Sequence, residues 1–322
     1  MNLSLPEDLC NHRGFKHVFK PGKLTFGLIA PIEGYALSPF PTMKNHAEMA
    51  QLADQGGISS LWIRDVPFFD PRFGDVGQIY DPMVYLGYLA SITKNITLGT
   101  TGIVSTLRDP LFTAKQAASI DQLSGGRFLL GLSTGDRPVE YPAFNAKFED
   151  RGERYREGWN LIKKVTEEEF PSLTTHHYGS LHGAIDLVPK PVQSRIPMMV
   201  VGRAQQSMEW IASNADAWLW YATDTSRIGE VITDFNTAGD GKTFRPYGYS
   251  TWFDMSPNPD GPLHNSHGVL RGGWKALISH FKQQEEAGVS HIALNMKPMQ
   301  RPAKDMLNDL IDHVLPHFLG QE

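Results

Sequence analysis

The chain has 322 residues, a hydrophobic share of 41% and a net charge of −5, which suits one large globular domain. Acidic and basic residues are interspersed, so the sequence lacks the Lys/Arg block typical of nucleic-acid binding. Cys10 is the only cysteine, which excludes an internal disulfide. There is no apolar signal segment and no apolar run of about 18 residues, so we expect a cytoplasmic protein that does not span a membrane.

From Leu24 onward, short apolar runs typical of strands alternate with longer stretches of helical period. The sequence predicts strands at residues 24–30, 60–64, 96–101, 128–133, 198–201, 217–220, 247–253 and 291–295. It predicts helices at residues 43–55, 82–93, 111–123, 151–168, 205–213, 227–238, 270–287 and 303–318. Repeated strand–helix units of this number predict an α/β fold, a (β/α)₈ TIM barrel.

A doubly wound sheet would show the same alternation, but it usually carries a glycine-rich phosphate turn after its first strand. That turn reads APIEGYALSPFP here, which favours the barrel. We expect a single domain over residues 1–322, with 1–23 as an N-terminal extension. Two connections are long enough to be insertions: 176–196 after the fourth helix, which predicts a hairpin, and 254–267 after the seventh strand, which predicts a mobile lid.

The segment ITLGTTGIVSTLRDPLFTAKQAASIDQLSGGRFLLGLSTGD, residues 96–136, carries several features at fixed spacing. They are the Gly99-Thr100 strand end, Arg108 and Pro110 before a helix, Asp121 and Leu123, the Ser124–Arg127 turn, and the strand end from Gly131 to Gly135. This segment closely resembles the third and fourth strands of bacterial luciferase-like flavin monooxygenases. A looser resemblance runs from Leu24 to about Leu319.

The resemblance implies a flavin whose ring lies over the barrel mouth, against the third and fourth strands. Thr100, Thr101 and Gly102 would let backbone approach the ring closely, with a cis peptide at Thr101-Gly102; plain layer packing is the alternative reading. At the end of the fourth strand, Ser133, Thr134 and Gly135 would meet the ring edge, because barrel enzymes place functional groups at such strand ends.

The cofactor phosphate is expected at the loops after the fourth and fifth strands. The run Val201-Gly202-Arg203-Ala204-Gln205-Gln206-Ser207 is interpreted as a strand end, a glycine turn and a helix start, where free N–H groups attract phosphate. From this run Val201, Gly202, Arg203, Ala204 and Ser207 are the expected contacts. Arg154 and Tyr155 are expected to face the same phosphate, although the arginines of this helix also suit an ordinary solvated face.

Asp65 and Ser133 are the candidate catalytic residues. Many members of the resembling family have a histidine after the acid that ends the second strand, but here Val66 occupies that position and cannot move protons. Asp65 retains a carboxylate, for which an ion pair with Arg64 is the favoured interpretation. Ser133 matches a reactive cysteine of some luciferases, and its hydroxyl excludes thiol chemistry there.

Other titratable residues form no diagnostic group. Glu33, His264, His267 and His291 are each more often surface or core residues than catalysts. The histidines of the first insertion do not predict a metal site, because adjacent residues of a strand point to opposite faces; they are His176, His177 and His182.

The leading hypothesis is a two-component-type monooxygenase, in which FMN reduced by a partner reductase and O₂ act on a small organic substrate. The alternatives are hydride transfer with the deazaflavin F420 and a non-catalytic flavin-binding relative; an isomerase or aldolase barrel would need a lysine or acid pair that the strand ends lack. The resemblance also implies a homodimer through the helices beside the early strands. Aromatic residues suggest an apolar pocket: Phe68, Phe69, Phe73, Tyr80 and Trp252.

Overall fold

A computed structural model of the chain describes residues 4–221, 225–266 and 268–318, and within them eight parallel strands close into a barrel. Each strand pairs with the next along the chain, and β10 and β13 complete the ring through β1. The strands are β1 (Thr25–Ile29), β2 (Ser60–Ile63), β3 (Thr97–Thr100), β5 (Phe128–Ser133), β8 (Met198–Val201), β9 (Ala217–Tyr221), β10 (Tyr247–Met255) and β13 (His291–Asn295). The predicted (β/α)₈ barrel is confirmed.

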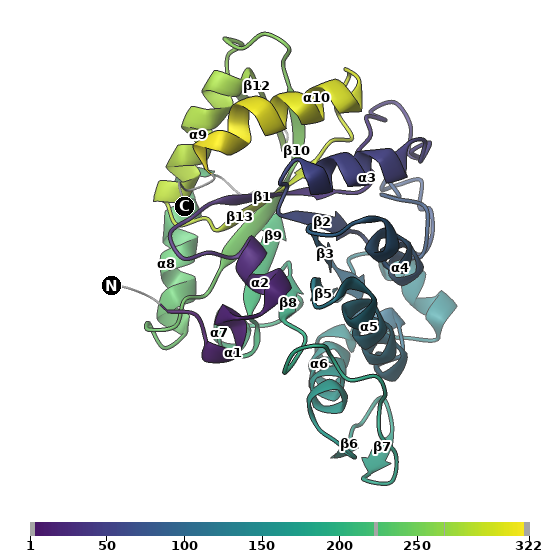
Figure 1. Cartoon of the computed structure of the whole chain (residues 1–322). Helices are drawn as coiled ribbons and strands as arrows, with labels where there is room; N and C mark the ends of the chain where they lie inside the picture. Colours follow the sequence, from purple (N-terminus) through teal and green to yellow (C-terminus); the bar gives the residue numbers. More distant parts are fainter. Residues whose placement is uncertain (1–3, 222–224, 267, 319–322) are drawn as a thin grey trace.

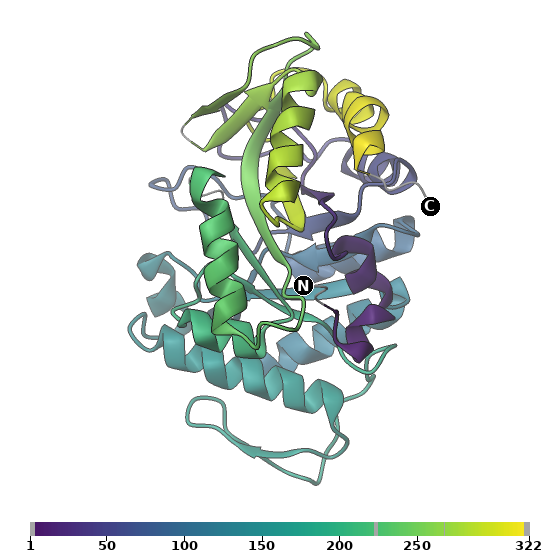
Figure 2. The same cartoon turned by 90° about the vertical axis from the view of Figure 1, so that its left-hand side faces the viewer.

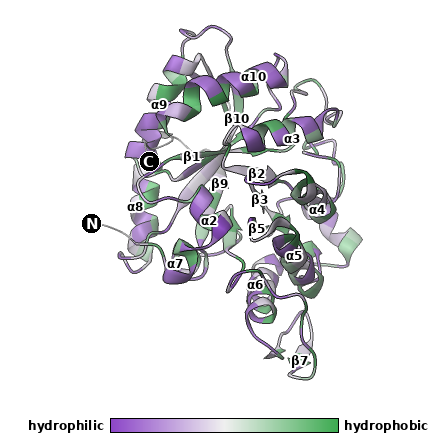
Figure 3. Ribbon diagram, viewed as in Figure 1, coloured by the Kyte–Doolittle hydropathy of each residue, from purple (hydrophilic) through white to green (hydrophobic). Residues whose placement is uncertain are grey.

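Eight helices, each following a barrel strand, surround this ring (Figure 1). They are α3 (His46–Gln55), α4 (Pro82–Ile92), α5 (Pro110–Ser124), α6 (Arg151–Glu167), α7 (Met208–Asn214), α8 (Ile228–Ala238), α9 (Trp274–Glu286) and α10 (Ala303–Asp309). The last continues as η4 (Leu310–Val314) and η5 (Leu315–His317). Figure 3 shows α9 and α10 with both hydrophobic and hydrophilic residues along their length, as expected for helices that bury one face on a barrel.

Helices α4 and α5 each begin at an Asp-Pro pair that can be seen in the sequence. The Asp81 carboxylate accepts from the amides of Met83 and Val84, and the Asp109 carboxylate accepts in the same way at α5. An N-cap aspartate satisfies free helix amides, and a proline at the first helical position needs no partner for its nitrogen. These caps fix where the chain leaves the barrel mouth after β2 and β3.

Three predicted helix starts are wrong by three or four residues. Helix α3 begins at His46 because Met43 and Asn45 both have φ of 57°, which is not helical. Helix α7 begins at Met208, because the residues before it form a loop with further positive φ angles. Helix α9 begins at Trp274, because the four residues before Gly273 form a strand, β12 (Val269–Gly272).

Both predicted insertions are present, but their internal structure differs from the expectation. The first contains an antiparallel hairpin of β6 (Ser172–Thr174) and β7 (Ser180–His182), so the hairpin lies earlier than 176–196. It projects beyond α6, away from the barrel (Figures 1 and 2). In the second, β10 extends to Met255 and β11 (His264–Ser266) pairs with β12. His267 lies outside the described residues.

The N-terminal extension closes the amino end of the barrel. Helices α1 (Glu7–Cys10) and α2 (Arg13–Val18) cross this end of the ring, where they appear in purple in Figure 1. Buried residues of this segment, among them Phe15 and Phe19, pack against the interior residues Trp62 and Met199. The barrel interior is therefore a filled core at this end. None of the helices in the described residues is both long and apolar enough to span a bilayer.

His291, one of the predicted acid–base alternatives, lies inside this core. Its Nε2 accepts from Trp62 Nε1 at 2.9 Å, and its Nδ1 lies 2.8 Å from the Thr25 hydroxyl. Thr25 donates in turn to the Val18 carbonyl, so Nδ1 carries the proton of a neutral imidazole. Burial lowers the pKa of His291 to about 3. The side chain is therefore a structural hydrogen-bonding group at the wrong end of the barrel for catalysis.

This network predicts a loss of stability in mild acid. Since the pKa of His291 is depressed in the folded state, its contribution is complete above about pH 6.5 and is lost toward pH 3, by at most ~1.4 kcal/mol per pH unit. Urea unfolding at pH 7 and pH 5 should therefore show a steeper decline for the wild type than for His291→Gln. Other buried histidines, such as His12, are common to both proteins and cancel in this difference. Parallel declines would contradict the assignment.

Candidate active site

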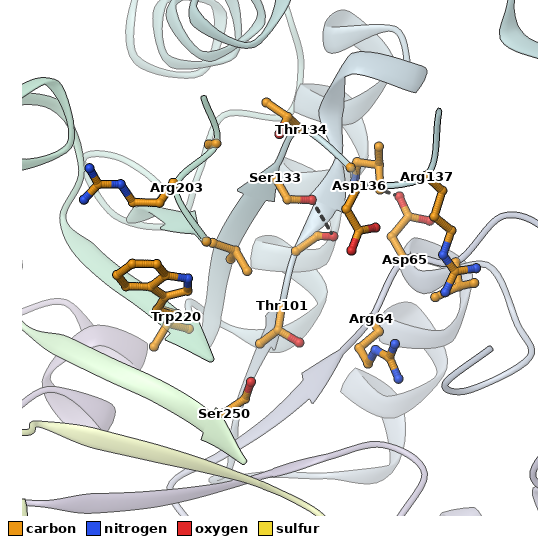
Figure 4. Close-up of a pocket in the computed structure, with 18 of the residues that line it drawn as sticks. Arg64, Asp65, Thr101, Ser133, Thr134, Asp136, Arg137, Arg203, Trp220 and Ser250 are labelled. Carbon is orange, nitrogen blue, oxygen red and sulfur yellow. Dashed lines mark hydrogen bonds between the residues drawn. The ribbon is translucent and has the colours of Figure 1, made fainter. Parts of the chain in front are cut away.

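A cavity of about 710 Å³ opens at the carboxyl ends of the barrel strands (Figure 4). Its lining comes from the ends of β2, β3, β5, β8, β9 and β10 and from the loops that follow several of them. This volume is typical of cofactor and substrate pockets. Enzymes with this fold carry their catalytic groups at the same end of the barrel. The cavity is therefore the candidate active site.

The floor of the cavity is formed by Thr101, Gly102 and Ser133. The Thr101-Gly102 peptide is cis, as the family resemblance implied. A Cβ at Gly102 would lie 2.8 Å from Val201 Cγ2 and 3.0 Å from the Gly131 carbonyl oxygen, so no larger residue fits. The Ser133 hydroxyl donates to the Gly102 carbonyl at 3.4 Å. Thr101 Oγ1 has no hydrogen-bond partner among the described residues. A flat polar ligand would fit this floor.

The neighbouring Thr100 does not line the cavity, contrary to the expectation for this strand. Its hydroxyl donates to the Gly131 carbonyl at 2.7 Å and accepts from the Gly131 amide at 2.9 Å. Thr100 therefore joins β3 to β5 underneath the floor. Thr134 and Gly135, by contrast, line the cavity.

The loop after β8 forms one edge of the cavity. Val201, Gly202, Arg203 and Ala204, the expected phosphate contacts, line it. The predicted helix start at this point is not present, because α7 begins only at Met208. Ser207 is the N-cap of that helix, where its hydroxyl accepts from the Trp210 amide, and it does not line the cavity.

The arginine that α6 contributes to the cavity is Arg151, at the first position of the helix. Its guanidinium donates to the Phe148 carbonyl at 2.7 Å and lies 3.6 Å from the centre of the Phe148 ring. The predicted Arg154 lies about 4.5 Å further along the helix axis and packs over Tyr178 of the first insertion. Tyr155, the other residue expected near the phosphate, is fully buried and donates to the Leu132 carbonyl, and it does not line the cavity.

Asp65 lines the cavity, but its partner is not Arg64. Arg108 binds the Asp65 carboxylate with two nitrogens, each at 2.8 Å, and the Val104 amide donates to it at 3.0 Å. The carboxylate is 1% exposed. The predicted ion pair therefore exists with a different arginine, from the loop after β3. Through Val104 this pair fixes the backbone that follows the cavity floor.

Arg64 instead belongs to a cluster around Asp75, in the long loop between β2 and α4. Arg64 Nη1 bonds the Asp75 carboxylate, and Lys297 Nζ, from the loop after β13, lies 3.3 Å from it. The Gly77 amide also donates to this carboxylate. Burial alone would raise the pKa of Asp75, but Arg64 and the Gly77 hydrogen bond outweigh it and hold the pKa below its usual value. The acid is therefore charged at neutral pH.

The same loop is held over the cavity by Arg137, which follows β5. Arg137 donates to the Asp75 carbonyl at 3.1 Å and to the Phe68 carbonyl at 3.3 Å, and it lies 4.5 Å from the centre of the Phe73 ring. Lys297 adds a bond to the Gly74 carbonyl. Cations from three strand ends thus fasten this loop at the barrel mouth.

Two further carboxyl groups of the lining, Asp136 and Glu140, follow β5. Glu140 lies on η2 (Pro138–Phe144), 5% exposed, with Arg137 Nη1 at 3.8 Å. Burial raises the pKa of Glu140, although Arg137 opposes the shift. Asp136 is exposed and has no ion pair or hydrogen bond among the described residues. Sequence analysis did not single out Glu140, because nothing local marks an η2 residue as facing a pocket.

The aromatic prediction holds only in part. Phe73 and Trp252 line the cavity, whereas Phe68 and Phe69 do not, and Tyr80 lines a smaller neighbouring cavity behind Asp65. The lining also includes residues that sequence analysis did not single out; Trp220, Tyr249 and Ser250 are three of them. Trp220 lies near the carboxyl end of β9, and Ser250 of β10 pairs with Tyr221, the last residue of β9.

The remaining predicted alternatives lie outside the cavity. The Glu33 carboxylate accepts from the amides of Thr42 and Met43 and so braces a loop. His264 is exposed on β11. Among the described residues there is no group of three or more His, Cys, Asp or Glu side chains that could hold a metal ion.

The structure is a closed parallel (β/α)₈ barrel with a cavity at the carboxyl ends of its strands. Enzymes with this fold bind their ligands at that end. The partnerless Thr101 Oγ1 on the floor, with Arg151 and Arg203 at the cavity edge, fits a polar ring with an anionic tail. Residues 24–246 match the luciferase-like monooxygenase family. The chain belongs to this family, as its sequence resemblance predicted.

Comparisons with individual proteins give two kinds of relative. The chain is 27% identical over 181 residues to 4-hydroxyprotoasukamycin monooxygenase of Streptomyces nodosus subsp. asukaensis, covering 55% of this chain and 47% of the relative. It is 33% identical over 142 residues to an F420-dependent glucose-6-phosphate dehydrogenase of Kineococcus radiotolerans, covering 43% and 41%. The chain thus spans about half the length of the curated relatives it matches.

A solved F420-dependent secondary alcohol dehydrogenase, in complex with an F420-acetone adduct, has the same fold. The TM-score is 0.74 with 18% identity, over 92% of this chain and all of that one.

Proposed function

We propose that this chain is a monooxygenase that uses reduced FMN and O₂ to oxidise a small organic substrate. The observation that supports it most is the cavity floor at Thr101 and Gly102, with Arg151 and Arg203 at one edge. Bound reduced flavin would supply the electrons that activate O₂ for insertion of one oxygen atom into the substrate.

In this proposal the floor holds the flavin ring and the two arginines hold its phosphate. The hydroxyls of Thr101 and Ser133 hydrogen-bond the polar edge of the ring, and the arginines pair with the phosphate. The loop over the cavity, fastened by Arg137 and Lys297, keeps bulk water from the reacting atoms.

The proposal includes a reductase that delivers reduced FMN, a cytoplasmic location and a homodimer. Apolar side chains remain exposed on α4 and α5, among them Val84 at 72%, Tyr88 at 44% and Phe112 at 72%. Exposed apolar patches of this kind mark interaction surfaces. Sedimentation equilibrium should therefore give twice the chain mass, and a monomer would contradict this part of the proposal.

The second candidate is hydride transfer with F420. The names of two proteins similar to this chain, one by sequence and one by fold, include this cofactor. F420 also combines a flat ring with a phosphate-bearing tail, so the floor and the arginines suit it equally well.

Equilibrium titration separates these candidates. The purified protein is titrated with oxidised FMN, with FMN reduced under anaerobic conditions, and with F420, while absorbance and fluorescence are followed. We expect reduced FMN to bind most tightly, followed by substrate-dependent oxygen uptake in a screen of small organic compounds. Preferential binding of F420 would replace the proposal with hydride transfer. Binding of FMN without oxygen uptake for any compound would favour a non-catalytic flavin-binding relative.

A further inference from the structure

The cavity carries cations at two separate places, and the proposed cofactor accounts for only one. Arg151 and Arg203 lie at the edge formed by α6 and the β8 loop, where the proposed function puts the phosphate. Arg64 lies at the end of β2, and Figure 4 shows it apart from Arg203, with Thr101 between them. FMN has a single phosphate group. The phosphate therefore accounts for the first of these two places only.

The acids of the protein neutralise only part of the positive charge around Arg64. The Asp75 carboxylate pairs with both Arg64 and Lys297, which gives two cations to one acid. Arg64 uses only Nη1 in that pair; its Nε and Nη2 have no partner among the described residues, and the side chain is 23% exposed. Asp65, next in the chain, is already bound by Arg108. Among the described residues, no acid other than Asp75 forms an ion pair with Arg64.

The nearest competing acids do not cancel this charge. Glu140 faces Arg137 at 3.8 Å, so its nearest cation is Arg137 and not Arg64. Asp136 comes from the loop after β5, and Figure 4 shows it beside Ser133, away from the Arg64 guanidinium. Both acids therefore lie toward the β5 side of the cavity.

The wall beside Arg64 is aromatic. Phe73 in the overlying loop and Tyr249 and Trp252 on β10 line the cavity. Lys297 Nζ lies 5.4 Å from the centre of a Trp252 ring, so the cation cluster and the aromatic wall are adjacent. A ligand that contacts both would combine a flat apolar body with an anionic group.

We propose that the substrate is a small organic acid with an apolar or aromatic body, and that Arg64 binds its carboxylate through the nitrogens that Asp75 leaves free. A guanidinium presents parallel N–H donors that match a carboxylate, which a neutral substrate cannot exploit. Arg64 is thus a specificity-determining residue of the proposed site. This inference rests on the proposed function, because the cofactor phosphate must occupy the other cations.

The test compares carboxylates with their primary amides, which have the same shape and no charge. The FMN-loaded protein is titrated by calorimetry with benzoate and benzamide, phenylacetate and phenylacetamide, and hexanoate and hexanamide. We expect at least one acid to bind about tenfold more tightly than its amide. Benzenesulfonate distinguishes a carboxylate site from a general anion site, since the proposal expects it to bind more weakly than benzoate.

Arg64→Met should abolish the preference for the acid and leave amide binding within about twofold. Arg64→Lys keeps the charge beside Asp75 but lacks the parallel N–H donors of a guanidinium, so it should retain an intermediate preference for the acid. This variant also serves as a control in case the methionine variant has a folding defect. Arg72→Met is the matched control, because Arg72 lies in the same loop, is 70% exposed and pairs with Asp70 outside the cavity. It should bind acids like the wild type.

The possible failures are distinguishable. If no FMN binds, the proposed function fails, and the acid–amide comparison is made on the F420-loaded protein or, if F420 also fails, on the chain alone. If the cofactor binds but no acid is preferred over its amide, the inference is overturned. Equal losses of acid and amide binding in Arg64→Met would also overturn it, since they would mean that Arg64 only braces the loop through Asp75.

Discussion

Replacing Arg151 and Arg203 together by methionine should weaken FMN binding by about 100-fold, from two lost charge-assisted hydrogen bonds partly screened by solvent. Arg203 is exposed and Arg151 half-buried, so each contributes less than a fully buried cation would. Riboflavin has the same ring and no phosphate, so its affinity should change by about twofold at most. The measurement is quenching of flavin fluorescence in paired FMN and riboflavin titrations.

The control for this prediction removes an arginine that is not part of the cavity. Arg227→Met takes away a 72% exposed arginine that pairs with Glu230 at the start of α8. Both ligands should bind this variant as they bind the wild type. If FMN and riboflavin lose affinity equally in the double variant, the arginines stabilise the cavity edge and the phosphate lies elsewhere.

The substitution Asp65→Asn should lower the free energy of unfolding by ~2–3 kcal/mol, because it leaves the half-buried Arg108 without its main partner. Asp81 still binds Arg108 at 2.9 Å, which keeps the cost below that of a wholly unpaired buried cation. Because the Val104 amide also depends on this carboxylate, FMN affinity should fall as well. Urea unfolding and FMN titration measure the two effects.

Arg108→Met tests whether Asp65 acts through this pair. If it does, the single variants should have similar effects and the double variant should be less destabilised than their sum. A proton-transfer role for Asp65 predicts something else: normal stability and FMN affinity in Asp65→Asn, with turnover lost at every pH. That result would restore Asp65 as a catalytic residue.

Local sequence patterns were sufficient for the barrel and for the cavity floor. Strand and helix periods mark the alternation, and the pairs Asp81-Pro82 and Asp109-Pro110 mark helix starts to within one residue. The place of Thr101 and Gly102 at the cavity was expected from the resemblance of residues 96–136 to the luciferase-like family. These features were predictable because each depends on a few consecutive residues and on local hydrogen bonds.

Side-chain partners were not predictable in this way. The adjacency of Arg64 and Asp65 suggested an ion pair, but the closed barrel sends Asp65 to Arg108 and Arg64 to Asp75. Neighbouring residues at a strand end point in different directions, so the partners come from other loops. For the same reason sequence analysis did not recognise Arg64 as a cation of the cavity.

The sequence by itself determined the class of fold, the family and the part of the chain that forms the cavity floor. Only the tertiary structure decided that Arg151 lines the cavity while Arg154 does not, and that the N-terminal residues around Phe15 fill the opposite end of the barrel. The physical reason is the separation along the chain of the residues that determine each feature. Periodicity and helix caps are set by neighbours along the chain, whereas a pocket is set by strand ends and loops that meet only when the barrel closes.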